Sequence, residues 1–150
     1  MTIYLASDHA GFELKQTLAQ CLRERGIVVE DLGTHSSERA DWADYGYRLA
    51  CRVASDGAGA RGIAVCGSGI GMSIVTNKVA GVRAALCVTP YMAEMSRRHN
   101  DANVLCLGAR IVTPDQAREI VETWLKTPFE GGRHADRLAT LERLTGKDCR

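Results

Sequence analysis

The feature that most constrains this chain is segment 62–73, GIAVCGSGIGMS, in which an apolar run passes directly into three closely spaced glycines. This pattern is typical of a buried strand that leads into a helix through a loop whose backbone approaches another group closely. Such a loop directs several N–H groups, and the positive end of the next helix, at one point, which suits a phosphate or a developing oxyanion. Cys66 is the first residue of this loop.

The position of Cys66 in this loop bears on the pKa of its thiol, and so on whether the thiol can react. Lowering the pKa of a free thiol from about 8.5 to about 7 takes roughly 2 kcal/mol, and a helix end usually supplies about 0.3 to 1 kcal/mol. A reactive thiolate here therefore needs a second positive group nearby. The alternative is an inert structural thiol, because free cysteine is among the most buried residue types.

Strands and amphipathic helices alternate along the whole chain. The predicted strands are 2–6, 27–32, 62–65, 83–88 and 103–107. The predicted helices are 12–25, 42–55, one that runs from the glycine loop to about residue 79, 90–99, 114–126 and 134–144. Continuous apolarity over 84–88 favours a parallel sheet covered on both faces. The alternation predicts one domain of 150 residues with an α/β fold: a doubly wound, Rossmann-like, five-stranded parallel sheet in an α/β/α sandwich, with an extra C-terminal helix.

In such sheets, ligands bind beyond the carboxyl ends of the strands, where the strand order reverses. With the order 2-1-3-4-5, the reversal lies between the first and third strands. The loop that holds Asp8 and His9 would then face the loop of Cys66. Taken alone, Asp8 could simply cap the first helix and His9 could be an exposed loop residue.

His99 and Asn100 lie between a predicted helix and the fifth strand, which normally places them at the opposite edge of the sheet. A histidine there often just complements a helix C-terminus. Within one chain His99 therefore cannot reach Cys66, so it is either structural or serves a site on a neighbouring chain.

Three arginines are candidates for phosphate binding. Arg133 and Arg137 are four residues apart, so they share one face of a helix and can bind one phosphate together. Gly131-Gly132 before them indicates an arm that reaches a partner chain, and Arg110 follows the fifth strand. Two solvated surface charges are the alternative for the helical pair.

The bulk composition excludes several classes of protein. The net charge of +1, from 19 basic and 18 acidic residues, predicts no binding to nucleic acid or to an anionic membrane. The chain shows neither a signal peptide nor an apolar run of membrane-spanning length, and its six cysteines, Cys149 among them, form no Cys-x-x-Cys pair. We expect a cytoplasmic protein with reduced thiols.

Other motif interpretations fail on single residues. A dinucleotide fingerprint needs a third glycine, and a cysteine-dependent phosphatase loop needs an arginine, where this chain has Met72. No close pair of Cys or His residues indicates a metal site. The remaining candidates are expected to be structural: Cys21, Cys87, Cys106 and His35.

Taken together, these residues resemble the ribose-5-phosphate isomerase type B family, which includes galactose-6-phosphate and allose-6-phosphate isomerases. The resemblance covers nearly the whole chain and is carried by these segments: SDHAG at 7–11, GT at 33–34, CGSGIG at 66–71, NK at 77–78, RRHND at 97–101, GAR at 108–110 and EGGRH at 130–134.

The resemblance implies an aldose–ketose isomerase that uses no metal or cofactor and acts through an enediolate. It assigns catalytic roles to Cys66 as the base, to His99 in opening the sugar ring across a dimer interface, and to Ser68 in proton transfer between the sugar oxygens. Asp8 would contact the sugar. The other implied substrate contacts are His9, Asp41, Trp42, Gly67, Gly69, Ile70, Gly71, Asn100, Arg110, Arg133 and Arg137.

The family resemblance also implies a homodimer with shared active sites, and leaves open whether dimers pair into tetramers. Many family members have Asp-Tyr-Pro where this chain has Asp41-Trp42-Ala43, at the sugar pocket. Ribose 5-phosphate is the expected substrate. The alternatives are a tetrose or hexose phosphate (erythrose 4-phosphate, allose 6-phosphate or galactose 6-phosphate), or a non-catalytic sugar-phosphate sensor.

Overall fold

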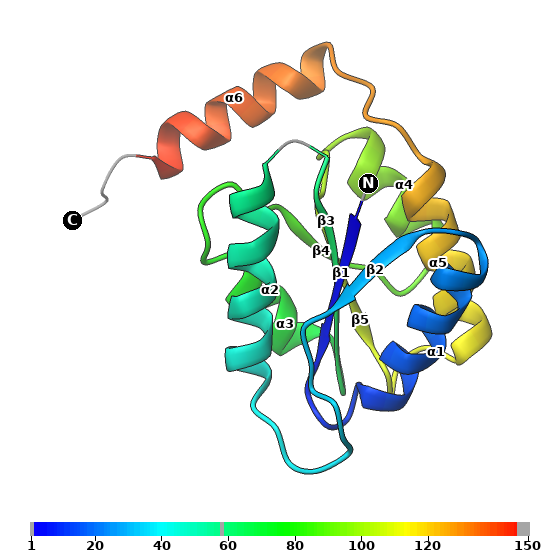
Figure 1. Cartoon of the computed structure of the whole chain (residues 1–150). Coiled ribbons are helices and arrows are strands. Elements are labelled where there is room, and N and C mark those ends of the chain that lie inside the picture. Colours follow the sequence, from blue (N-terminus) through cyan, green and yellow to red (C-terminus); the bar gives the residue numbers. More distant parts are fainter. Residues whose placement is uncertain (1, 58, 147–150) are drawn as a thin grey trace.

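The computed structural model describes residues 2–57 and 59–146. In these residues strands and helices alternate as expected, so the predicted α/β fold with a C-terminal helix is confirmed (Figure 1). The elements are β1 (Thr2–Ser7), α1 (Phe12–Glu24), β2 (Val28–Asp31), α2 (Trp42–Asp56), β3 (Arg61–Cys66), α3 (Ile70–Thr76), β4 (Ala84–Leu86), α4 (Pro90–Arg98), β5 (Val104–Gly108), α5 (Pro114–Lys126) and α6 (Arg133–Thr145).

The five strands are all parallel, in the order β2-β1-β3-β5-β4. The expected order 2-1-3-4-5 is therefore wrong at one place, because β5 lies between β3 and β4. The physical reason is burial: every residue of β5 is buried, whereas the three residues of β4 are only half-buried. The more apolar strand takes the inner position, where both its faces and both its edges are covered.

The reversal of strand order falls between β1 and β3, as predicted. Ser7 at the end of β1 is paired in register with Val65 near the end of β3. The loops that follow these two strands therefore leave the sheet side by side.

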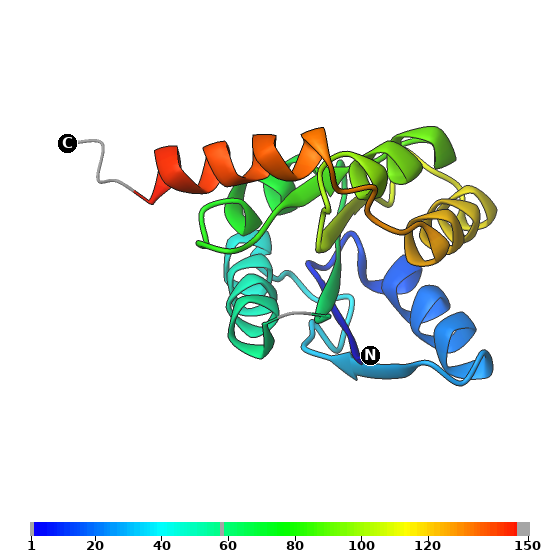
Figure 2. The same cartoon turned by 90° about the horizontal axis from the view of Figure 1, so that it is seen from above.

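Helices cover both faces of the sheet, as the view from above in Figure 2 shows for α1 and α2. One core cluster joins alternate sheet residues such as Leu5 and Ile63 to α1, α4 and α5. The other joins Ala6 and Ala64 to α2 and α3, and it includes Cys66. The alternation of side chains along a strand thus sends Cys66 toward the face covered by α2 and α3.

A buried ion pair supports the loop after β1. Lys15, fully buried on α1, pairs with Asp31 at the end of β2, and the Asp31 carboxylate also accepts the Gly33 N–H at 2.9 Å. Burial lowers the pKa of Lys15. Burial also acts to raise the pKa of Asp31, but Lys15 and the Gly33 N–H hold it below its usual value. The Gly33 carbonyl accepts the Ser7 N–H at 2.7 Å, so this network fixes the backbone just before Asp8.

The exposed edge of β4 is covered by one side chain. Helix α3 ends at Thr76 rather than near the predicted residue 79, and Asn77 then turns its carboxamide toward Ala84. Asn77 accepts the Ala84 N–H at 2.9 Å and donates to the Ala84 carbonyl at 3.0 Å. This carboxamide takes the place that a neighbouring strand would occupy.

Helix α6 passes across the side of the sheet where the strands begin (Figure 1). Gly131 and Gly132 precede it with φ angles of +67° and +55°, a region that favours glycine. His134 is its buried residue, and most of the helix is exposed. None of the described helices combines the length and apolarity needed to span a membrane.

Candidate functional site

A cavity of about 360 Å³ lies at the carboxyl edge of the sheet, where the loops after β1, β3 and β5 meet the start of α2. The predicted convergence of the Asp8 and Cys66 loops is therefore confirmed. The residues that line the cavity are Asp8, His9, Ala10, Trp42, Cys66, Gly67, Ser68, Gly71, Arg110 and Ile111. Ala10 and Ile111 were not predicted, because small and aliphatic side chains carry no chemical signal in the sequence.

The glycine loop wraps around the sulfur of Cys66. Its Sγ accepts the Gly69 N–H at 3.1 Å, and the side chain is 4 % exposed. Gly69 has a φ of +78°, and a Cβ there would lie 2.5 Å from a side-chain atom of Leu86. Only glycine fits this position, and the fit directs a backbone donor at the sulfur. A donated N–H stabilises negative charge on the acceptor.

The end of β5 holds this loop in place. The Ala109 N–H donates to the Cys66 carbonyl at 2.8 Å, and the Arg110 N–H donates to the Gly67 carbonyl at 2.9 Å. A Cβ on Gly108 would lie 2.6 Å from the backbone of Ser68. The same contacts place the Arg110 guanidinium over Gly67, where a Cβ would lie 3.3 Å from its Nη1. Arg110 is thus the arginine that lines the cavity together with Cys66.

Asp8 and His9 also serve the loops around them. Asp8 is 6 % exposed, and its Oδ1 accepts the Gly11 N–H at 3.0 Å before α1. The imidazole Nδ1 of His9 lies 3.1 Å from the Ala40 carbonyl and 3.3 Å from its nitrogen. Both residues line the cavity, so their capping and loop contacts occur alongside a position at the site.

Three predicted contact residues lie beside the cavity rather than on its wall. Asp41 is the N-cap of α2 and accepts the Ala43 N–H at 2.9 Å, while its neighbour Trp42 packs over Gly71. Gly69 donates its backbone N–H to the Cys66 sulfur. Ile70 is 55 % exposed on α3.

The other predicted residues gather at the opposite edge of the sheet. His99 ends α4 and stacks on His134 of α6, with ring centroids 4.2 Å apart. Arg133 and Arg137 lie on α6 beside His134, and Asn100 faces a separate cavity. None of these residues lines the Cys66 cavity, as the topology predicted for a single chain.

His99, Glu130 and His134 are the described residues that could offer a cluster of metal ligands, with ligand atoms within 4.8 Å of one another. Their geometry does not suit an ion. The two rings are stacked with an interplanar angle of 11°, so their nitrogen lone pairs lie in nearly parallel planes and do not converge. Imidazole binds a metal along its in-plane lone pair.

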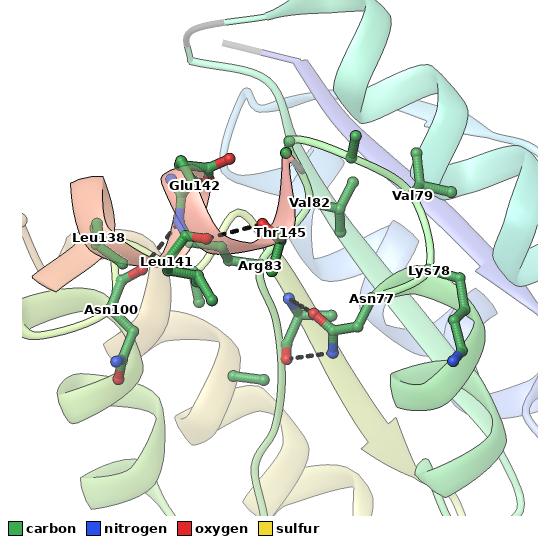
Figure 3. A pocket seen from close by; sticks show the side chains of 16 residues that line it. Asn77, Lys78, Val79, Val82, Arg83, Asn100, Leu138, Leu141, Glu142 and Thr145 are labelled. Atoms are coloured by element: carbon green, nitrogen blue, oxygen red, sulfur yellow. Dashed lines mark hydrogen bonds and ion pairs between the residues drawn. The ribbon is translucent and has the colours of Figure 1, made fainter. Parts of the chain in front are cut away.

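A second cavity, of about 600 Å³, lies between α6 and segment 77–85. Figure 3 shows Leu138 and Leu141 of α6 opposite Val82, with Asn77 bonded to the edge strand. The charged side chain of Arg83 is paired with Glu142 at 3.5 Å. The cavity contains no thiol or imidazole. It lies beneath α6, on the side of the sheet where the strands begin.

Cys87 and Cys106 are buried thiols of the core. Burial raises the pKa of Cys87 to about 11 and that of Cys106 to about 12, which supports the structural roles predicted for them. Cys21 lies half-buried on α1, and the described cysteines are all free. Cys149 lies outside the described residues.

The chain is similar to known proteins over nearly its whole length. The sequence profile of the family described as Ribose/Galactose Isomerase matches residues 3–141. The chain belongs to this family. It is 47% identical to ribose-5-phosphate isomerase B of Escherichia coli, over 95% of both chains. It is 41% identical to D-erythrulose-4-phosphate isomerase of Pectobacterium atrosepticum, over 94% of this chain and 93% of that one.

Solved structures agree with this family membership. Ribose-5-phosphate isomerase B of Clostridium thermocellum matches with a TM-score of 0.94 and 49% identity, over 97% of this chain and 98% of that chain. The Mycoplasma genitalium enzyme with bound ribulose-5-phosphate matches with a TM-score of 0.94 and 38% identity, over 97% of both chains. The chain is a sugar-phosphate isomerase of the aldose–ketose type, which confirms the expected enzyme class.

Alkylation at pH 8 should distinguish the thiols. We expect iodoacetamide to modify Cys66 and a bound sugar phosphate to protect it. Cys87 and Cys106 should stay unmodified, because at pH 8 only about one in 10³ and one in 10⁴ of these thiols is ionised. Peptide mapping by mass spectrometry measures each site. Labelling of Cys66 that is unaffected by the ligand would contradict its place in the substrate cavity.

Proposed function

We propose that this protein interconverts ribose 5-phosphate and ribulose 5-phosphate through an enediolate, with Cys66 as the base. One observation carries the proposal: the Cys66 sulfur accepts a backbone N–H in the cavity that it shares with Asp8, Ser68 and Arg110. The relatives named as ribose-5-phosphate isomerases, and the relative solved with ribulose-5-phosphate, support a pentose phosphate.

The chemistry requires a base and a stabilised oxyanion at the same place. The Cys66 thiolate removes the C2 proton of the open-chain aldose and returns a proton to C1. Ser68 passes a proton between the two sugar oxygens, so that charge and atoms balance over the cycle. The N–H groups from Gly67 to Gly71 hold the enediolate charge as it forms. A positioned base contributes about 10² to 10⁴ in rate, and each oxyanion donor about 3 kcal/mol.

The remaining roles divide between two copies of the chain. Asp8 contacts the sugar, Trp42 and Asp41 border it, and His9 and Arg110 approach the phosphate from the same chain. The other roles belong to residues of a second copy, at the opposite edge of the sheet. His99 would open the sugar ring, Asn100 would contact the substrate, and Arg133 and Arg137 would bind the phosphate.

A homodimer resolves the separation of these two groups. Large apolar side chains are exposed on α3 and α4, including Ile74, which is 53 % exposed, and Tyr91, which is 69 % exposed. These helices offer an apolar face for a second copy, which would bring its His99 to the first copy's Cys66. A tetramer and a cytoplasmic location with reduced thiols stay predictions.

The Cys66→Ala variant should lose exchange of the substrate C2 proton with solvent, because no other described group in the cavity can take its place as a thiolate. Binding of a phosphate ligand should remain within about twofold, since the phosphate contacts are separate from the sulfur. Proton NMR in deuterated water measures the exchange, and calorimetry measures the binding. Full activity of this variant would remove the proposed mechanism.

A panel of aldose phosphates with four, five and six carbons should give the highest kcat/KM for ribose 5-phosphate. Trp42 lines the cavity and packs over Gly71, and we expect its bulky indole to leave the least room for hexose phosphates, which should react most slowly. A coupled assay for each ketose product provides the measurement. A higher kcat/KM for the tetrose would instead favour the activity in the name of the Pectobacterium relative.

Shared active sites can be tested with mixed dimers. Cys66→Ala and His99→Asn chains, co-expressed with different tags and purified as the mixed dimer, should recover about half of wild-type activity, because one of the two sites then has both groups intact. Each homodimer alone should be inactive with the cyclic aldose. A mixed dimer of Cys66→Ala and Cys66→Ser is the matched control. No recovery in the first mixed dimer would exclude sharing.

A further inference from the structure

The imidazole of His99 is held against a second imidazole. Its ring lies on that of His134 with centroids 4.2 Å apart and an interplanar angle of 11°. His99 ends α4 and His134 lies in the first turn of α6, so the stack joins two elements that are far apart in the chain. A stack of this kind covers one face of the His99 ring and limits its rotation.

His134 is itself firmly placed. It is 5 % exposed, and its backbone N–H donates to the Gly131 carbonyl at 3.1 Å at the turn into α6. Burial and the neighbouring positive charges of His99 and Arg133 lower the pKa of His134, while Glu130 acts in the opposite direction. At neutral pH His134 is therefore an uncharged, buried ring that offers His99 a fixed surface.

Stacking, rather than a hydrogen bond, is the main contact to His99. The Nε2 atoms of His99 and His134 lie 3.8 Å and 3.5 Å from Oε2 of Glu130, beyond the length of a normal hydrogen bond. The other carboxylate oxygen of Glu130 is engaged by Arg98, and the Glu130 N–H donates to the Arg98 carbonyl at 3.0 Å. Glu130 thus joins the two chain segments, whereas the His134 ring is what touches His99.

We propose that His134 is a positioning residue for ring opening: its buried imidazole holds the His99 ring in the orientation that transfers a proton to or from the cyclic sugar phosphate. The inference rests on the ring-opening role of His99 in the proposed function. A proton donor or acceptor must lie within hydrogen-bond reach of the reacting oxygen, and a misplacement of about 1 Å can cost about 10² in rate.

The stack also links two parts of the substrate site. Arg133 and Arg137, proposed to bind the phosphate, lie on the same helix as His134, one residue before it and three after it. A phosphate bound by these arginines would therefore fix His134, and through the stack His99, relative to the sugar. Ring opening would then occur only when the phosphate is in place.

Ring opening can be measured separately from proton transfer at carbon. Ribulose 5-phosphate has no free 5-hydroxyl and cannot close to a five-membered ring, so exchange of its C1 hydrogen with solvent deuterium needs Cys66 but no ring opening. Ribose 5-phosphate is cyclic in solution through its 4-hydroxyl, so its net isomerisation needs both steps. The ratio of the two rates isolates the contribution of His99 and of anything that positions it.

The test compares His134→Ala, His134→Phe and His99→Asn, with His35→Ala as the control for an exposed histidine outside the site. We expect His134→Ala to lower kcat for ribose 5-phosphate by about 10-fold to 100-fold and to leave deuterium exchange into ribulose 5-phosphate within about twofold. His134→Phe, which keeps a flat ring at this position, should recover kcat to within about threefold of wild type. His35→Ala should change neither rate.

Three results would overturn the proposal. The first two are an unchanged kcat in His134→Ala and an equal fall in isomerisation and exchange, which would mark a general structural defect. Failure of His134→Phe to recover kcat, with a thermal unfolding midpoint equal to that of wild type, would also reject the stacking role. If His99→Asn itself keeps full kcat for ribose 5-phosphate, the proposed role of His99 fails instead, and the two failures are thereby distinguished.

Discussion

The continuation of the β3–β5 pairing beyond the strands is the interaction on which the site depends. The register that pairs Cys66 with Gly108 carries on into hydrogen bonds from Ala109 and Arg110 to the glycine loop. The loop is therefore an extension of the sheet, with the rigidity of a central ladder. This rigidity aims an N–H at the Cys66 sulfur and fixes the backbone of Arg110, whose guanidinium lies over Gly67.

The same parallel sheet separates the functional groups. The end of each parallel strand lies at one edge and the end of each returning helix at the other, so Cys66 and His99 cannot meet within one chain. The fold instead gathers a thiol with backbone N–H groups at the carboxyl ends of the strands, and imidazoles with cationic side chains at the opposite ends. A second copy of the chain that joins the two edges would complete a site that neither edge has alone.

Most of the fold and the Cys66 half of the site could be predicted from sequence, because local apolar patterns, glycines and caps fix them. The positions of β4 and β5 could not, since both strands read as apolar and only their relative burial decides which lies inside. The stack of His99 on His134 gives no sequence signal either. The two residues belong to different elements, and their contact depends on the path of the chain through Gly131 and Gly132.

The carboxamide of Asn77 on β4 carries a donor and an acceptor spaced like those of a peptide unit, and both are already engaged by Ala84. An incoming strand from another molecule would first have to displace this mimic. Sideways growth of the sheet, the route by which exposed edges seed fibrils, is thereby discouraged at this margin by one side chain. In the proposed dimer, the two copies would then associate through helices while their sheets stay apart.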